Sequence, residues 1–495
     1  MTHDIQARFD AVRSNIIGID QEFTGPFGTK RIIYADWIAS GRLYRPIEDR
    51  MLHTIGPYTA NTHTDSTVTG STMTEAYEEA KAIIKRHVNA GPNDVLICTG
   101  TGMTGALAKL QRILGWKLPE QVSGRLQLDT DDRPVVFVTH AEHHSNQTSW
   151  METICDVVIM PPDADGKTDL DAFATLLASY AHRSTLVAAV TAGSNVTGYV
   201  PPYRAIARMI HRAGGLCFVD FACAAPYVTI DMHPEDEEAW LDAIVFSPHK
   251  FLGGPGTCGV LVFNSALYNN RIPDIPGGGT VKWTNPWGQH LFLDDIEQRE
   301  DGGTPPFLQT IRTALCVRLK EYMGVDNIHA REQELLSMFF HALDNVPGVH
   351  ILAADIRDRI GVFSLCIRNL HHNLAVKMLN DRFGIQARGG CSCAGTYGHY
   401  LLELDREYSS GMIEKITKGE ATERPGWIRI SLHPLMTDDE ARIIIDAIIE
   451  VSRNHMAWKT DYVYDPRTDQ FSHITQKGSA CCNSWFEFAE EGMRG

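Results

Sequence analysis

The sequence has no excess of positive charge. Its 45 lysine and arginine residues stand against 61 aspartate and glutamate residues, which gives a formal net charge of −16 at pH 7. Proteins that bind nucleic acids or anionic membranes need clustered positive charge on the binding surface. The charge balance disfavours both classes, and we expect neither a nucleic acid nor a membrane as partner.

Three further features are missing: a long apolar run, an apolar N-terminal segment and a regular cysteine pattern. No stretch of about 18 apolar residues occurs, so no membrane-spanning helix is expected. Charges are spread through the N-terminal residues, which argues against a secretory signal. The 11 cysteines are odd in number and irregularly spaced, which fits a reducing compartment better than a disulfide framework. We expect a cytoplasmic protein.

The composition supports a folded core, because apolar residues make up 43% and charged residues 21% of the chain, near the globular average. Short apolar runs that end in polar or small residues alternate with stretches of helical spacing. Buried parallel strands have this pattern, and their ligands bind beyond the carboxyl ends. The runs are Val95–Cys98, Pro134–His140, Thr185–Asn195, Gly215–Cys223 and Ala243–Lys250.

This alternation predicts an α/β fold with a mostly parallel sheet, followed by a smaller α+β domain. In the smaller domain, Thr437 before three acidic residues predicts the start of a helix. We divide the chain into an N-terminal segment that joins the small domain, a large α/β domain, the small domain and a C-terminal extension, with the boundaries 1–60, 61–325, 326–455 and 456–495.

Gly100, Gly102 and Gly105 form a G-x-G-x-x-G pattern between a predicted strand and a predicted helix. The pattern is typical of dinucleotide-binding folds. What the pattern provides physically is a helix N-terminus whose free N–H groups can bind an anion. A ligand with a single phosphate would fit this site as well as a dinucleotide would. A tight glycine turn without any ligand is the third interpretation.

Lys250 stands at the end of a predicted strand, in the motif Ser247-Pro-His249-Lys250. A lysine at the mouth of a buried strand favours Schiff-base chemistry, because partial burial lowers its pKa and frees the amine as a nucleophile. Ser247 is a candidate hydroxyl ligand of a phosphate. The alternative is a lysine whose charged end reaches the surface.

Asp220 and His143 follow two other predicted strands. The carboxyl group of Asp220 can hold a pyridinium nitrogen protonated, as pyridoxal 5'-phosphate (PLP) requires, or it can cap a turn. His143, between Glu142 and His144, can stack on a planar cofactor and move protons. A bare His-His pair lacks the i, i+4 spacing of a helical metal site, so no metal is predicted.

The predicted small domain carries two cysteines in the motif Arg388-Gly-Gly-Cys391-Ser-Cys393. Arg388 can favour the thiolate form of a nearby cysteine. Spacing alone leaves three options: a nucleophile, a metal or redox cluster with Cys481 and Cys482, or inert thiols.

Together these residues indicate PLP chemistry. A phosphate turn, a stacking histidine, an acid for a pyridine nitrogen and a Schiff-base lysine follow successive strands. No acid lies at a convincing strand end about 20 residues after the glycine turn, where a dinucleotide ribose needs one. An NAD-dependent oxidoreductase is therefore the weaker alternative. Arg429 in the strand Trp427–Ser431 is a candidate clamp for a substrate carboxylate, or an exposed surface arginine.

At this level the chain resembles the cysteine desulfurase and selenocysteine lyase branch of the class V, fold-type I PLP enzymes. The resemblance covers roughly residues 30–450. It implies a large PLP-binding domain with a sheet of seven-stranded type between helices, and a small domain that carries the cysteine loop. It rests on the order of the motifs YADWIASGRLYRP, NTHTDS, TGTGMTGA, AEHHSN, GSNVTGYVPP, CFVDFACAAP, FSPHKFLGGPGTCGVL, IPGGGTV, EDGGTPP, ARGGCSCAG and WIRISLHP.

The resemblance implies roles for the matching residues. Lys250 binds the cofactor covalently, His143 stacks on its ring and moves protons, and Cys393 is the catalytic cysteine. Asp220 pairs with the pyridine nitrogen. Further cofactor contacts are implied for Thr101, Gly102, Met103, Asn195, Cys223, Ser247, His249 and Thr280, and substrate contacts for Ser40, Asn195, Arg388 and Arg429.

The implied function is a PLP-dependent cysteine desulfurase, which converts L-cysteine to L-alanine and carries the sulfur on Cys393 as a persulfide. The position of Thr280 implies a contact with the neighbouring subunit's cofactor phosphate, and hence a homodimer with shared active sites. Cys391 or a sulfur-acceptor protein takes the sulfur onward.

The sequence also departs from the family. Cys223 replaces the usual glutamine near the cofactor's phenolic oxygen, and a thiol is a weaker donor. The cysteine loop reads Cys-Ser-Cys, and the chain has an added tail. These departures leave open whether the substrate is cysteine, selenocysteine or a larger derivative. An aminotransferase or a β-eliminating C–S lyase shares every cofactor residue, and a catalytically silent scaffold is the alternative from another class.

Overall fold

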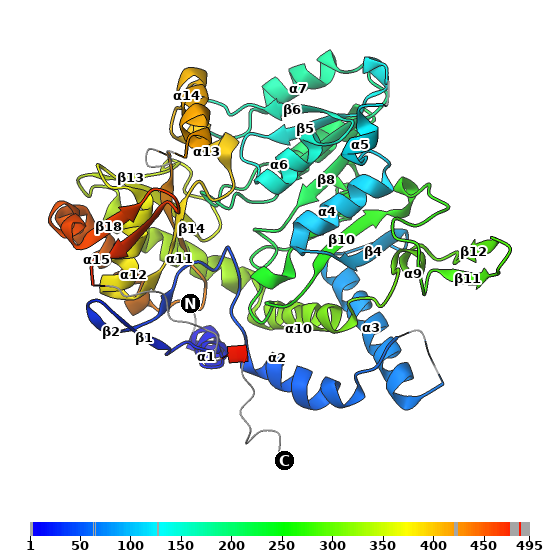
Figure 1. The fold of residues 1–495 in the computed structure, drawn as a ribbon, viewed down its shortest axis with the longest axis horizontal. Coiled ribbons are helices and arrows are strands. Elements are labelled where there is room, and N and C mark those ends of the chain that lie inside the picture. The colour runs from blue at the N-terminus through cyan, green and yellow to red at the C-terminus, as the bar shows by residue number, and fades with distance from the viewer. Residues whose placement is uncertain are drawn as a thin grey trace.

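A seven-stranded sheet lies at the centre of the larger lobe, in the order β4-β10-β9-β8-β7-β5-β6 (Figure 1). The structure, a computed structural model, describes residues 3–62, 64, 66–125, 128–419, 424–475 and 485–486. The sheet confirms the predicted α/β fold class. Its strands are β4 (Asp94–Thr99), β5 (Val135–Thr139), β6 (Asp156–Met160), β7 (Leu186–Thr191), β8 (Leu216–Asp220), β9 (Ala243–Phe246) and β10 (Gly259–Asn264).

The strands of this sheet are almost continuously apolar because both faces of the sheet are covered. Every residue of β5 and β7 is buried. Most neighbours pair in parallel, but β10 runs antiparallel to both β4 and β9. Because β10 lies between β4 and β9 and is antiparallel to both, β4 points the same way as β9, and therefore the same way as β5, β7 and β8. The carboxyl ends of these five strands therefore meet at one edge.

Helices form a layer on each side of the sheet. Alternate strand residues face opposite layers, so Phe137 packs in one cluster with helices α3, α7 and α8, whereas Val136 and Val138 pack in another with α4 and α6. These helices are α3 (Val68–His87), α4 (Gly102–Ile113), α6 (His144–Met151), α7 (Leu170–Ser179) and α8 (Tyr203–Arg212).

The smaller lobe is built on a four-stranded sheet in the order β13-β14-β17-β16. Its strands are β13 (Val349–Ile351), β14 (Val362–Ile367), β16 (Arg388–Gly390) and β17 (Trp427–Ser431). The N-terminal segment reaches this lobe, because β3 (Ile33–Tyr34) pairs in parallel with β15 (Ile385–Gln386). The main helices are α11 (Val325–Leu343), α12 (His372–Phe383) and α15 (Asp438–Trp458).

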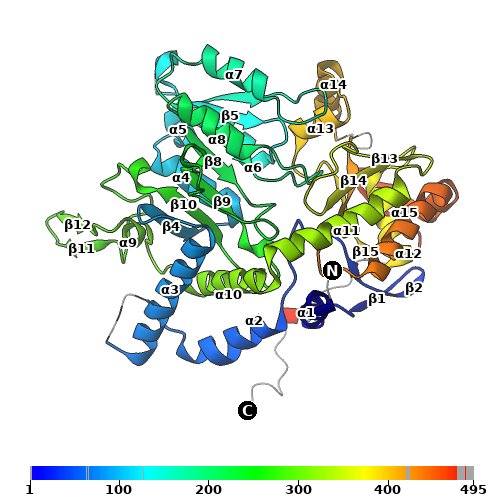
Figure 2. The ribbon, with the colours of Figure 1, turned by 180° about the vertical axis from the view of Figure 1, so that it is seen from behind.

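Helix α11 connects the two lobes, as the view from behind shows (Figure 2). It begins just after α10 (Phe307–Met323) ends. The limits of the four predicted segments, 1–60, 61–325, 326–455 and 456–495, stay predictions. Remaining elements are α1 (His3–Arg13), β1 (Glu22–Gly25), β2 (Gly28–Arg31), α2 (Arg45–Asp49), α5 (Glu120–Ser123), β11 (Val281–Thr284), β12 (His290–Phe292), α9 (Ile296–Glu300), α13 (Gly395–Leu401), α14 (Arg406–Thr417), β18 (Tyr462–Asp465) and β19 (Gln470–His473).

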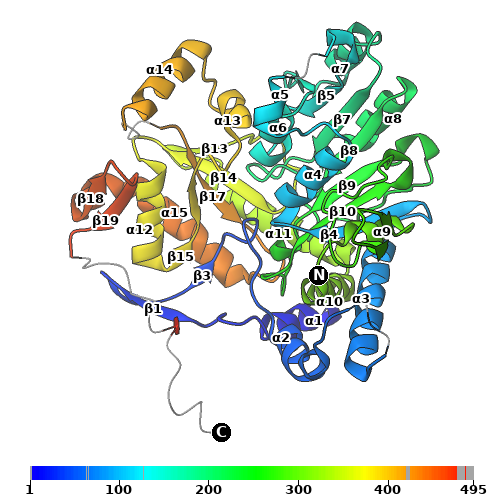
Figure 3. The ribbon, with the colours of Figure 1, turned by 45° about the vertical axis from the view of Figure 1, so that its right-hand side comes forward.

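The predicted C-terminal extension has structure of its own at its start. Helix α15 continues into it, and the β18–β19 hairpin packs against α12 (Figure 3). The tail cysteines Cys481 and Cys482 lie outside the described residues. Among the helices that the structure describes, none is both long and apolar enough to cross a membrane.

Helix α15 confirms the predicted start at Thr437. The Thr437 hydroxyl accepts the main-chain N–H of Glu440 at 3.2 Å, and the Glu440 carboxylate accepts the N–H of Thr437 at 3.3 Å. This reciprocal pair is a capping box, and it satisfies two N–H groups at the helix end.

We predict that Thr437→Ala lowers the free energy of unfolding by about 1 kcal/mol, because one helix N–H loses its acceptor. Urea denaturation followed by circular dichroism measures the loss. Thr437→Ser keeps the hydroxyl and is the matched control, with a change below about 0.5 kcal/mol. Equal losses in both variants would contradict the capping role.

Candidate active site

A cavity of about 450 Å³ lies where the carboxyl ends of the central strands face the smaller lobe. Its size is within the usual range for small-molecule sites. Most of the residues predicted for the site line it: Thr101, Gly102, Met103, His143, Asn195, Asp220, Cys223, Ser247, His249, Lys250, Arg388, Cys393 and Arg429. The fold thus brings together predicted residues that are up to 328 positions apart in the sequence, from Thr101 to Arg429 (429 − 101).

The glycine turn after β4 forms one wall. Gly100 and Gly102 have φ angles of 62° and 60°, in the left-handed region that favours glycine. A Cβ atom on Gly102 would lie 2.9 Å from the Ser247 hydroxyl oxygen, so the turn needs glycine for close approach as well. That hydroxyl accepts the N–H of Met103 at 2.7 Å. The N-terminus of α4 therefore opens at the cavity beside a hydroxyl, an arrangement suited to a phosphate.

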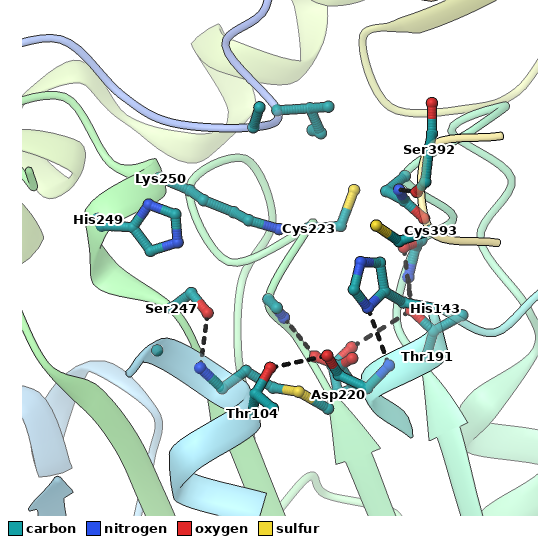
Figure 4. A pocket seen from close by; sticks show the side chains of 18 of the residues that line it. Thr104, His143, Thr191, Asp220, Cys223, Ser247, His249, Lys250, Ser392 and Cys393 are labelled. Carbon is teal, nitrogen blue, oxygen red and sulfur yellow. Dashed lines mark hydrogen bonds between the residues drawn. The ribbon is translucent and has the colours of Figure 1, made fainter. Parts of the chain in front are cut away.

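Lys250 and Asp220 lie in the cavity at the ends of neighbouring strands (Figure 4). Burial lowers the pKa of Lys250, and the nearby Cys223 and Asp220 oppose that shift. Asp220 is only 4% exposed, and burial raises its pKa to about 6, although the N–H of Ala222 and the charge of Lys250 oppose the rise. Lys250 is thus a cavity lysine, which excludes the surface alternative.

His143 caps the start of α6, where its Nδ1 atom accepts the N–H of Ser145 at 3.1 Å. Burial, followed by the charge of Lys250, lowers the pKa of His143 to about 3. The ring is therefore neutral at pH 7. With Nδ1 accepting, its single proton is on Nε2. A neutral, flat ring suits stacking against a planar group.

Glu142 anchors the turn that carries His143. Its Oε1 atom accepts the Thr139 hydroxyl at 2.6 Å and the N–H of Thr191 at 2.9 Å, and its Oε2 atom accepts the amide of Asn146 at 2.8 Å. The carboxyl group is fully buried, and burial raises its pKa to about 7. It ties β5, β7 and α6 together directly behind the cavity.

The cysteine loop enters the cavity from the smaller lobe. Ser392 and Cys393 have φ angles of 51° and 57°. The amide of Asn195 donates to the Ser392 carbonyl at 2.7 Å. Cys393 lines the cavity, whereas Cys391 lies outside it, with its sulfur 3.8 Å from the guanidinium of Arg424. All cysteines in the described ranges are free thiols.

Arg429 is 2% exposed, so it is not a surface arginine. It donates to a carboxylate oxygen of Asp36 at 2.5 Å and to the main-chain oxygen of Asn195 at 3.2 Å. Arg388 lies directly opposite it on the neighbouring strand. Two arginines on one wall suit a carboxylate ligand. Three buried atoms of the lining residues have no hydrogen-bond partner among the described residues: Asn195 Oδ1, Ser392 Oγ and Arg429 Nε.

Two predicted residues do not line the cavity of this chain. Ser40 donates to the Gly41 carbonyl at 3.2 Å, and its neighbours Ile38 and Ala39 line the wall instead. Thr280 is fully buried, and its hydroxyl donates to the Gly277 carbonyl at 2.7 Å. The contact of Thr280 with a second subunit stays a prediction.

Sequence reasoning also missed residues that the structure adds to the site. The lining includes Thr104, Ser145, Thr191, Gly193, Thr257 and Ser392. Thr191 is the last residue of β7 and Gly193 follows it, and the rule that ligands bind at and beyond strand ends identifies such positions. Asp36 reaches Arg429 only through tertiary packing, and its sequence context carries no signal for that contact.

The sequence profile of the aminotransferase class-V family matches residues 33–444. The chain belongs to this family. Among curated class-V relatives, a probable cysteine desulfurase of Staphylococcus aureus (strain Mu50) is 27% identical over 76% of this chain and 85% of its own length. One of Halalkalibacterium halodurans is 26% identical over 76% and 86%. The predicted family resemblance is confirmed.

Solved structures show the same fold. A cysteine desulfurase of Thermococcus onnurineus superposes with a TM-score of 0.71 at 20% identity, over 90% of this chain and 98% of that one. A cysteine desulfurase of Escherichia coli gives 0.69 at 20% identity, with the same coverage. This confirms the fold-type I architecture of the class-V chain.

The glycine turn supplies a test of the cavity wall. A Cβ atom on Gly259 in β10 would lie 2.0 Å from the main-chain oxygen of Gly102. Because this clash is with backbone, we predict that Gly259→Ala lowers the free energy of unfolding by about 1–3 kcal/mol, as overpacking does. Urea denaturation measures it. Gly124→Ala is the control, since nothing lies within 4 Å of that position; an unchanged stability in both would contradict the packing described.

Proposed function

We propose that this class-V protein is a PLP-dependent cysteine desulfurase, which converts L-cysteine to L-alanine and takes up the sulfur on Cys393. One observation carries the proposal: the Cys393 thiol of the smaller lobe and the Lys250 amine of the larger lobe line the same cavity. Figure 4 shows their side chains pointing toward one another past Cys223 and His143. The names of the curated relatives support the same activity.

The residues present fit PLP. The glycine turn and Ser247 form an anion site, Asp220 supplies a buried carboxyl for the pyridine nitrogen, and neutral His143 supplies a flat ring. Lys250 supplies an amine whose pKa is lowered by burial. The partnerless Asn195 Oδ1 atom offers a further polar contact. PLP bound there supplies an electron sink that stabilises negative charge on Cα of an amino acid.

The chain's own residues then orient the substrate and move its protons. Arg429 holds the substrate carboxylate, and Asp36 fixes the guanidinium through its hydrogen bond. Lys250, once its amine is released, takes the proton from Cα, for which a lowered pKa suits it. His143 holds its proton on Nε2 and can donate it to a reacting oxygen or nitrogen.

Cys393 performs the sulfur step. Its thiolate attacks the sulfur of the substrate, so an S–S bond forms as the Cβ–S bond breaks. The electron pair of the broken bond stays with the substrate carbon, which takes up a proton and leaves as alanine. Cys393 keeps the sulfur as a persulfide, and an external thiol releases it as sulfide. No additional oxidant is needed, because the substrate carbon is reduced as the two sulfur atoms are oxidised.

A homodimer with shared active sites is part of the proposal. The β11–β12 hairpin protrudes from the larger lobe just after Thr280 (Figure 1). It exposes large apolar side chains: Trp287 is 83% exposed, Trp283 67% and Leu291 57%. A second copy of the chain would cover them, and exposed apolar surface of this kind marks association sites.

The onward route of the sulfur and the location of the protein also belong to the proposal. Cys391 lies two residues from Cys393 but outside the cavity, where a sulfur-acceptor protein or Cys391 itself could receive the persulfide sulfur. The free thiols of the described chain support a reducing compartment such as the cytoplasm.

Product analysis tests the function. With L-cysteine and a thiol reductant, we predict alanine and sulfide in equal amounts, and a loss of more than about a hundredfold in Cys393→Ala, because the nucleophile is removed. Cys366→Ala, a free cysteine of the smaller lobe outside the cavity, is the control. Pyruvate and ammonia as products, or full activity in Cys393→Ala, would point instead to a C–S lyase or a transaminase.

A further inference from the structure

Two adjacent histidines at the start of α6 have different partners. His143 lines the cavity, but His144 does not. The Nε2 atom of His144 accepts the main-chain N–H of Gly395 at 2.9 Å, and its own main-chain N–H donates to the Cys393 carbonyl at 2.8 Å. His144 thus contacts the cysteine loop with both its ring and its backbone, on the two sides of Ala394.

The loop conformation depends on outside contacts. Ser392 and Cys393 are consecutive left-handed residues, a conformation that is unfavourable for side chains other than glycine and persists only when surroundings enforce it. At residues 392–396, four hydrogen bonds with the larger lobe do so. Two come from His144, one from the Asn195 amide to Ser392, and one joins the Thr396 hydroxyl to the Gln147 side chain at 2.7 Å.

The approach at Gly395 is close. A Cβ atom there would lie 3.1 Å from His144 Nε2, so only glycine lets the imidazole reach this N–H without a shift. Of these four hydrogen bonds, this is the one whose acceptor is an imidazole that can take up a proton, since the others end on carbonyl oxygens. A protonated imidazole has no lone pair and cannot accept it.

We propose that His144 is the positioning residue that holds Cys393 in the cavity, and that protonation of its ring releases the cysteine loop. The inference rests on the proposed function only in taking Cys393 as the sulfur nucleophile. His144 acts through the loop and not on the substrate, because its ring is bonded to Gly395.

The electrostatics give the direction of the pH effect. Burial, and then the charge of Arg424, lower the pKa of His144. Among the described residues, the other titratable groups near the contact are His143, which caps α6, His399 on α13 and the thiols of Cys391 and Cys393. In a released loop the ring regains the ordinary pKa of about 6.5. Release therefore takes up a proton, and it is favoured as pH falls from about 6.5 toward the lowered value, by up to about tenfold per pH unit.

Hydrogen–deuterium exchange of the peptide 391–398 in the cofactor-loaded, full-length protein tests the proposal. After correction for the intrinsic rate, we expect exchange to be severalfold faster at pH 5 than at pH 7.5. His144→Gln keeps an acceptor that does not titrate, so its exchange stays slow and changes less than about twofold. His144→Ala exchanges fast at both pH values.

Thr396→Val is the matched control. It removes a loop contact that does not titrate, so exchange rises at every pH while the pH dependence remains. The proposal is overturned if His144→Gln keeps the wild-type pH dependence, or if His144→Ala exchanges as slowly as the wild type. Hydrogen–deuterium exchange is measured without substrate. The proposed control of the cysteine loop by His144 can therefore be disproved independently of the proposed desulfurase activity.

Discussion

Lys250 and Asp220 are held at the carboxyl edge of the central sheet, in the wall of the cavity that faces the smaller lobe. Burial pushes the amine toward its neutral form and the carboxyl toward its protonated form, while their nearness opposes both shifts. A site with these properties lets one lysine serve as a nucleophile and as a base. The glycine turn and the neutral His143 form part of the cavity wall at this edge, and the buried Glu142 anchors the turn that carries His143.

The second half of the site comes from the smaller lobe, and the first residues of α6 join the two. His143 faces the cavity, while His144 contacts the loop that carries Cys393. Arg429 and Asn195 make a further connection, since the guanidinium donates to the Asn195 main chain. Any movement of one lobe against the other therefore changes the distance between the Cys393 thiol and the cavity residues of the larger lobe. The position of Cys393 thus depends on how the two lobes pack.

Much of this was predictable because parallel α/β sheets collect ligand-binding residues at one edge. Asp220, Lys250 and the glycine turn follow apolar strands, and their chemistry is visible in their residue types. Ser40 does not line the cavity, whereas its neighbours Ile38 and Ala39 do, and its substrate contact stays a prediction. The reversed direction of β10 was not visible, since a buried strand is equally apolar in either direction. Asp36 acts through a contact with the smaller lobe and His144 through contacts between the two lobes, and single-sequence patterns do not encode either.

We propose that Lys250, and no other amine, holds the cofactor. Lys320 is the instructive competitor, since burial lowers its pKa to about 7, but its amine donates to the carbonyls of Ala225 and Val228. Borohydride reduction of the PLP-loaded protein, followed by peptide mass mapping, decides between them. We expect a pyridoxyl phosphate adduct on the peptide that contains Lys250. An adduct on Lys320 or elsewhere, or none at all, would contradict it.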